Sequence, residues 1–72
     1  MKPLTEKQQR VYDYVIGYLE LFNVSPSIEE ITEHFEWSSM TASRAHVQAL
    51  LQKGYLTNTK FIRGLRPAQE GT

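Results

Sequence analysis

The sequence predicts a small, mainly α-helical domain in which three helices precede a two-stranded β-hairpin. Two helix-start signals, apolar residues at helical spacing behind them, and a β-branched and aromatic segment near the C-terminus carry this prediction. The 72 residues suffice for one domain, and a chain without cysteine has neither disulfide bonds nor thiolate metal sites. We expect residues 1–67 to form the domain and residues 68–72 to be a disordered tail.

The first helix is expected over residues 5–22. Thr5 and Gln8 match a capping box, in which the Thr5 hydroxyl accepts the Gln8 N–H and the Gln8 side chain reaches back to Thr5. Gly17 either destabilises this helix by up to about 1 kcal/mol relative to Ala or marks a close helix crossing. The apolar stripe comprises Val11, Val15, Tyr18 and Phe22, with Leu19 alongside. Three tyrosines are expected in the core or at its rim: Tyr12, Tyr14 and Tyr18.

The second helix is expected over residues 28–35. Ser25 precedes Pro26 and is therefore driven out of the helical region, which ends the first helix. Ser27 and Glu30 match a second capping box. The apolar face of this short helix consists of Ile28, Ile31 and Phe35.

The third helix is expected over residues 40–53, with Ser39 as its N-cap and Gly54 as a left-handed C-cap. Its inward face comprises Met40, Ser43, Val47, Leu50 and Leu51. Its outer face carries no acid and consists of Thr41, Arg44, Ala45, Gln48 and Gln52. Short side chains and hydrogen-bonding groups without negative charge suit a helix that enters the major groove of DNA. The alternative is an ordinary solvated face.

The segment after Gly54 predicts a hairpin with strands in residues 55–59 and 61–66, a turn at Asn58-Thr59-Lys60, and an end at Pro67. Two helices joined by a tight turn form a helix-turn-helix, and a hairpin behind it is a wing. The fold class is therefore a winged helix-turn-helix. Residues expected to contact DNA phosphates are Ser27, Gln52, Lys53, Lys60, Arg63 and Arg66.

The net charge of zero conceals a strong asymmetry along the chain. Residues 1–36 carry seven acids against three bases, a net charge of −4, whereas residues 37–72 carry five bases against one acid, a net charge of +4. The basic half can face a polyanion while the acidic half points away. Two solvated faces of opposite charge are the alternative interpretation.

Catalysis and cofactor binding are not expected. His34 and His46 lie on different predicted helices. A metal ion needs three or four convergent ligands, and the sequence offers no such set beyond the weak candidates Glu30, Glu33 and His34. His46 is expected to be a partly buried structural residue, and Trp37 a core residue rather than a stacking platform. The sequence shows no membrane span, signal peptide or small-molecule site, so a cytoplasmic protein is expected.

From Met1 to about Arg66, the chain resembles the DNA-binding domain of the LexA repressors, which control the bacterial SOS response. The resemblance implies a three-helix core with a wing and recognition by the third helix. The resemblance rests on residues that follow the family's order without a gap from Lys2 to Gly54, and on the closing segment Arg63-Gly64-Leu65-Arg66. The residues in gap-free order are Lys2, Leu4-Thr5, Gln8-Gln9, Val11, Pro26, Glu30-Ile31, Trp37, Ser39, Ala42, His46, Ala49-Leu50 and Lys53-Gly54. The resemblance implies base contacts from Ser39, Thr41, Ala42, Arg44 and Ala45, and the outer helix face adds Gln48.

The chain departs from the LexA pattern in three respects. Thr41 stands where Asn is common in the family, and Arg44 and Ala45 stand where Glu is common. An Arg donates to guanine where a Glu accepts from cytosine, so the docking mode carries over but the operator sequence does not. The hairpin is about one residue shorter than usual. The family's dimerising, self-cleaving second domain cannot fit in 72 residues, which indicates an excised domain or a stand-alone regulator.

Two functions follow from these observations. The first is a sequence-specific transcriptional regulator that binds a double-stranded DNA operator, most simply a LexA-like repressor. It would read the major groove with helix 40–53, and a second copy or a dimerising partner would occupy the adjacent half-site. The basic half and the acid-free outer face support it. The second is a winged-helix module that binds a repressor or polymerase subunit, supported by the neutral total charge and the altered recognition positions. With all three helices committed to one core, the isolated chain is expected to be monomeric.

Overall fold

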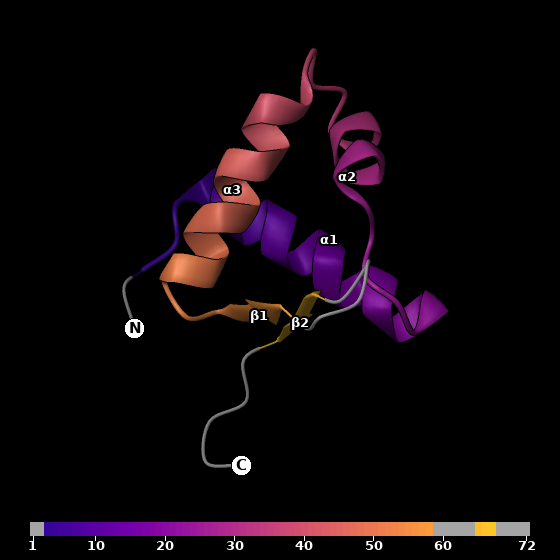
Figure 1. Cartoon of the computed structure of the whole chain (residues 1–72), viewed down its shortest axis with the longest axis vertical. Coiled ribbons are helices and arrows are strands. Elements are labelled where there is room, and N and C mark those ends of the chain that lie inside the picture. The colour runs from indigo at the N-terminus through magenta and orange to yellow at the C-terminus, as the bar shows by residue number, and fades with distance from the viewer. Residues whose placement is uncertain (1–2, 59–64, 68–72) are drawn as a thin grey trace.

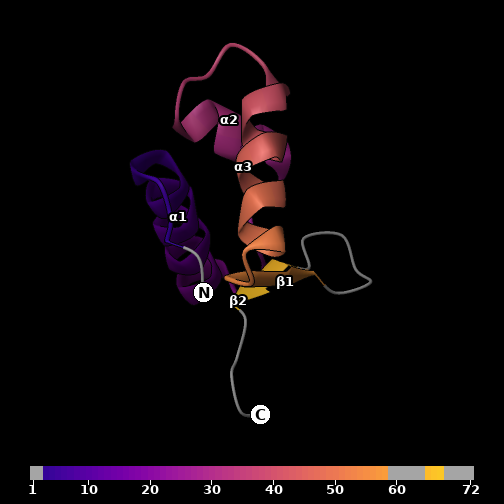
Figure 2. The same ribbon diagram turned by 90° about the vertical axis from the view of Figure 1, so that its left-hand side faces the viewer.

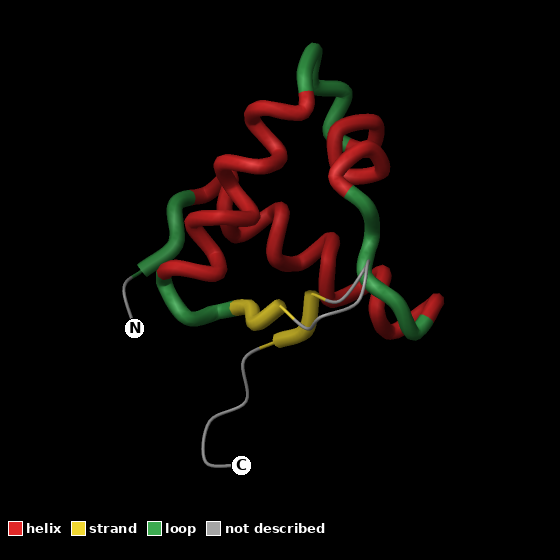
Figure 3. Tube along the Cα trace, in the orientation of Figure 1, coloured by secondary structure: helices red, strands yellow, loops and turns green. Residues whose placement is uncertain are grey.

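The computed structural model describes residues 3–58 and 65–67. Its elements are α1 (Glu6–Phe22), α2 (Ile28–His34), α3 (Met40–Gln52), β1 (Leu56–Asn58) and β2 (Leu65–Pro67). The three helices form a triangle, with α1 below and α2 and α3 rising to a shared turn (Figure 1). The view at right angles shows α1 and α3 side by side (Figure 2). Figure 3 shows that this turn and the hairpin lie at opposite ends of α3. The predicted fold class is confirmed.

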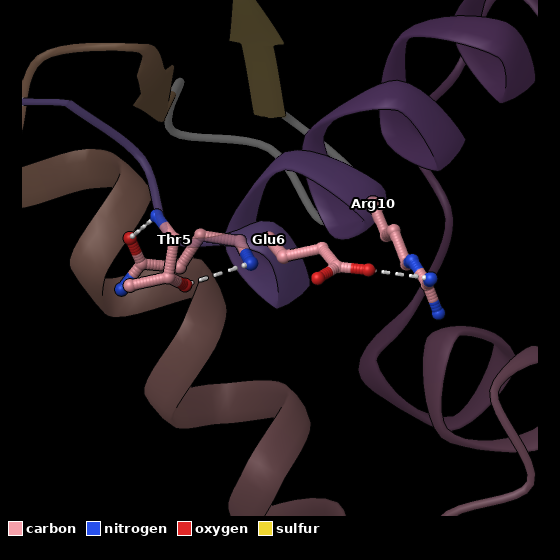
Figure 4. Close-up of polar contacts among 4 residues, drawn as sticks. Thr5, Glu6 and Arg10 are labelled. Carbon is pink, nitrogen blue, oxygen red and sulfur yellow. Dashed lines mark hydrogen bonds and ion pairs between the residues drawn. The ribbon is translucent and has the colours of Figure 1, made fainter.

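Both predicted capping boxes form. At the start of α1, the Gln8 N–H donates to Thr5 Oγ1 at 3.2 Å, and the Thr5 N–H donates to Gln8 Oε1 at 3.1 Å (Figure 4). Figure 4 also shows the Glu6–Arg10 ion pair at 2.7 Å, which is exposed and contributes little stability. At its other end, α1 stops because Asn23 adopts a left-handed conformation with φ 60°.

The second capping box also links α1 to α2. The Ser27 N–H donates to Glu30 Oε1 at 2.8 Å, and the Tyr18 hydroxyl donates to Glu30 Oε2 at 2.8 Å. One carboxylate therefore serves both the start of α2 and the neighbouring helix. Each of the two oxygens of this half-buried carboxylate thus accepts a hydrogen bond.

The core forms where the inward faces of the three helices meet the two strands. Its buried side chains are Val11, Val15, Ile31, Val47, Leu50, Leu56 and Leu65. Aromatic rings line its rim: Tyr14 stacks on His34 with centroids 4.0 Å apart, and Phe35 stacks on Trp37 at 4.8 Å. The half-buried Tyr12 and Trp37 pack against the core, as the sequence predicts. Burial, followed by the charge of Glu30, raises the pKa of Tyr14.

One prediction for α1 is wrong, and one open alternative is decided. Phe22 does not join the core but is 59 % exposed, and Leu21 and Val24 beside it are 80 % and 39 % exposed, because the last turn of α1 extends past its neighbours. The helices are therefore not wholly committed to one core. A Cβ added at Gly17 would meet nothing within 4 Å, so this glycine does not mark a close helix crossing.

The turn between α2 and α3 is compact. The Trp37 N–H donates to Thr32 O at 3.1 Å, and Glu36 adopts a left-handed conformation with φ 57°. Ser39 is the N-cap residue of α3, as predicted, and its side chain makes no capping hydrogen bond. At the other end, Gly54 has φ 86°, which confirms the left-handed C-cap.

The two strands, predicted within residues 55–59 and 61–66, are Leu56–Asn58 and Leu65–Pro67 among the described residues. Leu56 pairs with Pro67, Thr57 with Arg66 and Asn58 with Leu65, all antiparallel. The predicted turn at Asn58-Thr59-Lys60 extends into residues outside the described ranges, and Asn58 itself is the last residue of β1. The predicted Pro67 strand end is confirmed. Residues 59–64, with Lys60 and Arg63, and the predicted tail 68–72 lie outside the described residues.

Ser25 connects the α1–α2 junction to the hairpin. Its side chain is fully buried, and its hydroxyl accepts a hydrogen bond from the Leu65 N–H at 3.2 Å. Replacing Ser25 by Ala leaves that N–H without this acceptor and should lower the free energy of unfolding by about 1–3 kcal/mol. Urea denaturation measures the change. The exposed Ser38→Ala serves as a control and should change stability by less than about 0.5 kcal/mol. Equal changes in the two variants would contradict the assigned role.

Candidate nucleic-acid interface

Among the described residues, no other helix or strand covers the outer face of α3. Five side chains at helical spacing share this face, and all of them are exposed: Thr41, Arg44, Ala45, Gln48 and Gln52. Ser39 is exposed just before the helix, whereas Ala42 is half-buried at the edge of the face. Six of the seven residues expected at this face are thus exposed together on one side of the molecule. The face offers a hydroxyl, amides and a guanidinium, which are groups that bind base edges.

Arg44 is the residue on this face with the longest reach and the only full charge. No hydrogen bond or ion pair connects it to another residue within 3–58 and 65–67. Its guanidinium therefore has five N–H donors without partners among the described residues, in a planar arrangement that fits guanine O6 and N7 or a phosphate. The geometry is compatible with base reading and with a phosphate contact.

The opposite side of α3 holds the outer face in position. Ser43 is fully buried, and its Oγ lies 2.6 Å from Thr32 Oγ1 of α2. The Thr32 hydroxyl proton is already donated to Ile28 O at 2.8 Å, so Ser43 must be the donor to Thr32. This bond, together with the burial of Val47 and Leu50, anchors α3 against α2 and the core. The sequence contains no local signal for it, because the two partners lie on different helices.

The predicted phosphate-binding residues do not form one cluster among the described residues. Ser27 is occupied as a helix cap, where its hydroxyl accepts the Glu30 N–H at 3.1 Å. Lys53 Nζ donates to Gln8 Oε1 at 2.6 Å and to Pro3 O at 3.0 Å, which ties the end of α3 to the N-terminal segment. Arg66 is half-buried, with Nη2 at 3.5 Å from Asn23 O. Gln52 is exposed at the end of α3.

His46 packs against an aromatic side chain of the core rim. His46 is half-buried, with its ring centroid 5.2 Å from that of Trp37. Burial, with a smaller contribution from the charge of Lys7, lowers the pKa of His46 and favours the neutral imidazole. Within the described ranges, no group of three His, Cys, Asp or Glu side chains could hold a metal ion. No helix in that part of the chain is long and apolar enough to cross a membrane.

Comparison with known proteins identifies the family. The model of the LexA DNA-binding domain matches residues 1–61. The chain belongs to the LexA DNA-binding domain family. A LexA repressor of Thermosipho melanesiensis is 47 % identical over 66 residues, which cover 90 % of this chain and 33 % of that protein. LexA repressors of Petrotoga mobilis and Thermosipho africanus are 35 % and 42 % identical over 66 residues, with 92 % and 90 % of this chain and 32 % and 33 % of those proteins covered.

The chain spans about a third of the length of these LexA relatives. Its departures from the usual LexA pattern lie on the surface, since Thr41, Arg44 and Ala45 are all exposed. The buried residues of α3 are others, namely Ser43, Val47 and Leu50.

Proposed function

We propose that this chain is the DNA-binding unit of a LexA-like transcriptional repressor and that α3 reads its operator in the major groove. The observation that carries the proposal is the exposed, acid-free outer face of α3, on which Arg44 has no partner among the described residues. An α-helix about 10–12 Å across fits a groove about 12 Å wide. Such a regulator works in the bacterial cytoplasm, where the chromosome lies, and the proposal includes no enzymatic activity.

The same proposal assigns base contacts and phosphate contacts to different residues. Base edges are read from the N-cap and the N-terminal two-thirds of α3, by Ser39, Thr41, Ala42, Arg44, Ala45 and Gln48. The basic side chains of residues 37–72, whose net charge is +4, supply phosphate contacts around this face. A second copy of the chain or a dimerising partner occupies the adjacent half-site of a palindromic operator.

Salt dependence tests whether the chain binds DNA at all. Neutralisation of about three or four phosphates should make log K fall with log salt at a slope near −3, because each contact releases counterions. A fluorescence titration of random duplex at several salt concentrations measures the slope. A flat dependence, or no binding at low salt, would contradict the proposal and favour the winged-helix protein-interaction module.

The Arg44→Ala variant distinguishes base reading from a phosphate contact. If Arg44 reads guanine, the variant should lose about 1–3 kcal/mol on the selected operator, relax the preference at one base pair and bind random DNA almost as before. Arg10→Ala is a matched control, because it removes an equal charge from an exposed position on α1, away from the outer face of α3.

Operator titrations at constant salt measure the effect of Arg44→Ala. A loss that is equal on operator and random DNA, with the salt slope reduced by about one, would reassign Arg44 to a phosphate. Base reading would then rest on Ser39, Thr41 and the backbone around Ala42.

A further inference from the structure

A hydrogen bond between two hydroxyl groups joins α2 to α3. Ser43 is fully buried on α3, and its Oγ lies 2.6 Å from Oγ1 of the half-buried Thr32 on α2. In Figure 1 the two helices rise next to each other to the turn that connects them. Because Ser43 lies on the buried side of α3, its hydroxyl does not reach a partner of the outer face. An effect of this bond on recognition therefore passes through the position of the whole helix.

Thr32 is itself held from two directions. Its hydroxyl donates to Ile28 O, one turn earlier in α2, at 2.8 Å. Its carbonyl accepts the N–H of Trp37, in the turn before α3, at 3.1 Å. Because these bonds fix both the side chain and the backbone of Thr32, its hydroxyl oxygen is a rigid acceptor for Ser43. The bonds from Ser43 to Thr32 and from Thr32 to Ile28 run in series, so each strengthens the other.

The bond restricts the rotation of α3 about its own axis more sharply than apolar packing does. Ile31 of α2 and Val47 of α3 are held in the core by the hydrophobic effect, which has no preferred direction. A hydrogen bond weakens steeply when its donor turns away, and a buried hydroxyl without a partner is costly. A helix has a radius of about 5–6 Å with its side chains, so a rotation of about 10° moves their ends by about 1 Å. Binding sites need their groups placed within about 0.5 Å.

We propose that the Thr32–Ser43 hydrogen bond sets the rotation of α3 and thereby the direction in which its outer face, with Arg44, meets the bases of the operator. Thr32 and Ser43 are positioning residues in this proposal, since neither contacts DNA. The inference deepens the proposed DNA-binding function and rests on it. Replacing both partners of a buried hydrogen bond by apolar groups of the same shape changes stability little. The bond therefore contributes orientation rather than net stability.

The double variant Thr32→Val, Ser43→Ala removes both hydroxyls and leaves neither one unpaired. Valine has the shape of threonine, so circular dichroism and the urea midpoint should stay close to those of the unmodified chain. Thr32→Ser is the matched control, because it loses the methyl group but keeps the hydroxyl that bonds to Ser43. Ser43→Ala alone breaks the same bond without a change in α2, and should act in the same direction as the double variant.

Residual dipolar couplings of the ¹⁵N-labelled full chain measure the orientation of α3 without DNA. Their periodic variation along a helix reports both its direction and its rotation. In the double variant we expect the α3 couplings to depart from the orientation relative to α1 and α2 that fits the unmodified chain, whereas Thr32→Ser should reproduce it. Couplings of the double variant that still fit the original orientation would overturn the proposal, whatever the chain binds.

Fluorescence titrations on an operator selected from random duplexes by the unmodified chain measure the consequence for recognition. The ratio of operator to random affinity should fall at least about fivefold in the double variant, the lower end of what one bidentate base contact contributes. The affinity for random duplex and its salt slope should stay the same, and Thr32→Ser should keep the ratio. An unchanged ratio in the double variant, or an equal loss on both DNAs, would overturn the proposal. Altered couplings in a chain that binds no DNA would refute the proposed function and support only the effect of the bond on the rotation of α3.

Discussion

Replacing Leu50 by Ala is expected to lower the free energy of unfolding by about 2–5 kcal/mol. Leu50 is fully buried on α3, in the cluster where that helix meets Val15, Ile31 and Leu56. The truncation loses its apolar burial and leaves a cavity that a rigid three-helix core fills only in part. A domain of this size has only about 3–5 kcal/mol of net stability, so the variant should be largely unfolded at 25 °C.

Thermal and urea denaturation followed by circular dichroism measure this effect. Gln48→Ala is the control on the same helix: its side chain is exposed, and the change should stay within about 0.5 kcal/mol. If Leu50→Ala were as stable as this control, the position of Leu50 at the centre of the core would be wrong. Addition of operator DNA should restore part of the lost helicity, because a ligand that binds only the folded state stabilises it.

Joining two copies is expected to raise operator affinity by about 10²–10⁴-fold. One chain presents one recognition helix and reaches one half-site, whereas half-sites of helix-turn-helix dimers lie about 34–36 Å apart. Once one copy of a leucine-zipper fusion is bound, the second binds intramolecularly, at a high effective concentration. Titration of the fused and unfused chains on the same selected operator measures the ratio.

An operator with one half-site scrambled provides the control for this experiment. The fusion should lose most of its advantage on that DNA, because its second copy has only random sequence to contact. Sedimentation of the unfused chain should show a monomer at micromolar concentration. A tight dimer of the unfused chain, or an equal gain on the scrambled operator, would contradict the requirement for two positioned copies.

The helices could be predicted because their signals are local. A capping box joins residues three positions apart, and Thr5 with Gln8 and Ser27 with Glu30 form in the structure as the sequence indicates. Periodicity likewise separates the buried Ser43, Val47 and Leu50 from the exposed outer face of α3. The candidate interface is therefore readable from spacing alone, because a helix places residues three or four apart on one side.

The hairpin register could not be predicted, because a short strand carries little register information. Residues 55–66 contain several ways to pair two apolar segments, and the favoured turn dipeptides are absent. The structure pairs Asn58 with Leu65 where Leu65 can bury its side chain and donate its N–H to Ser25, 40 positions earlier. A hydrogen-bond partner that lies 40 positions away cannot be identified from the residues around the hairpin.

The sequence by itself determined where the helices of this protein begin and end and which face of α3 carries no acid and stays exposed. Only the tertiary structure decided that Phe22 lies outside the core, that Lys53 binds Gln8 and Pro3, and that Ser43 bonds to Thr32. The physical reason is the range of the interactions. Caps and helical faces depend on neighbours within one turn, whereas burial and side-chain pairing depend on how far each helix extends past the others when the three pack together.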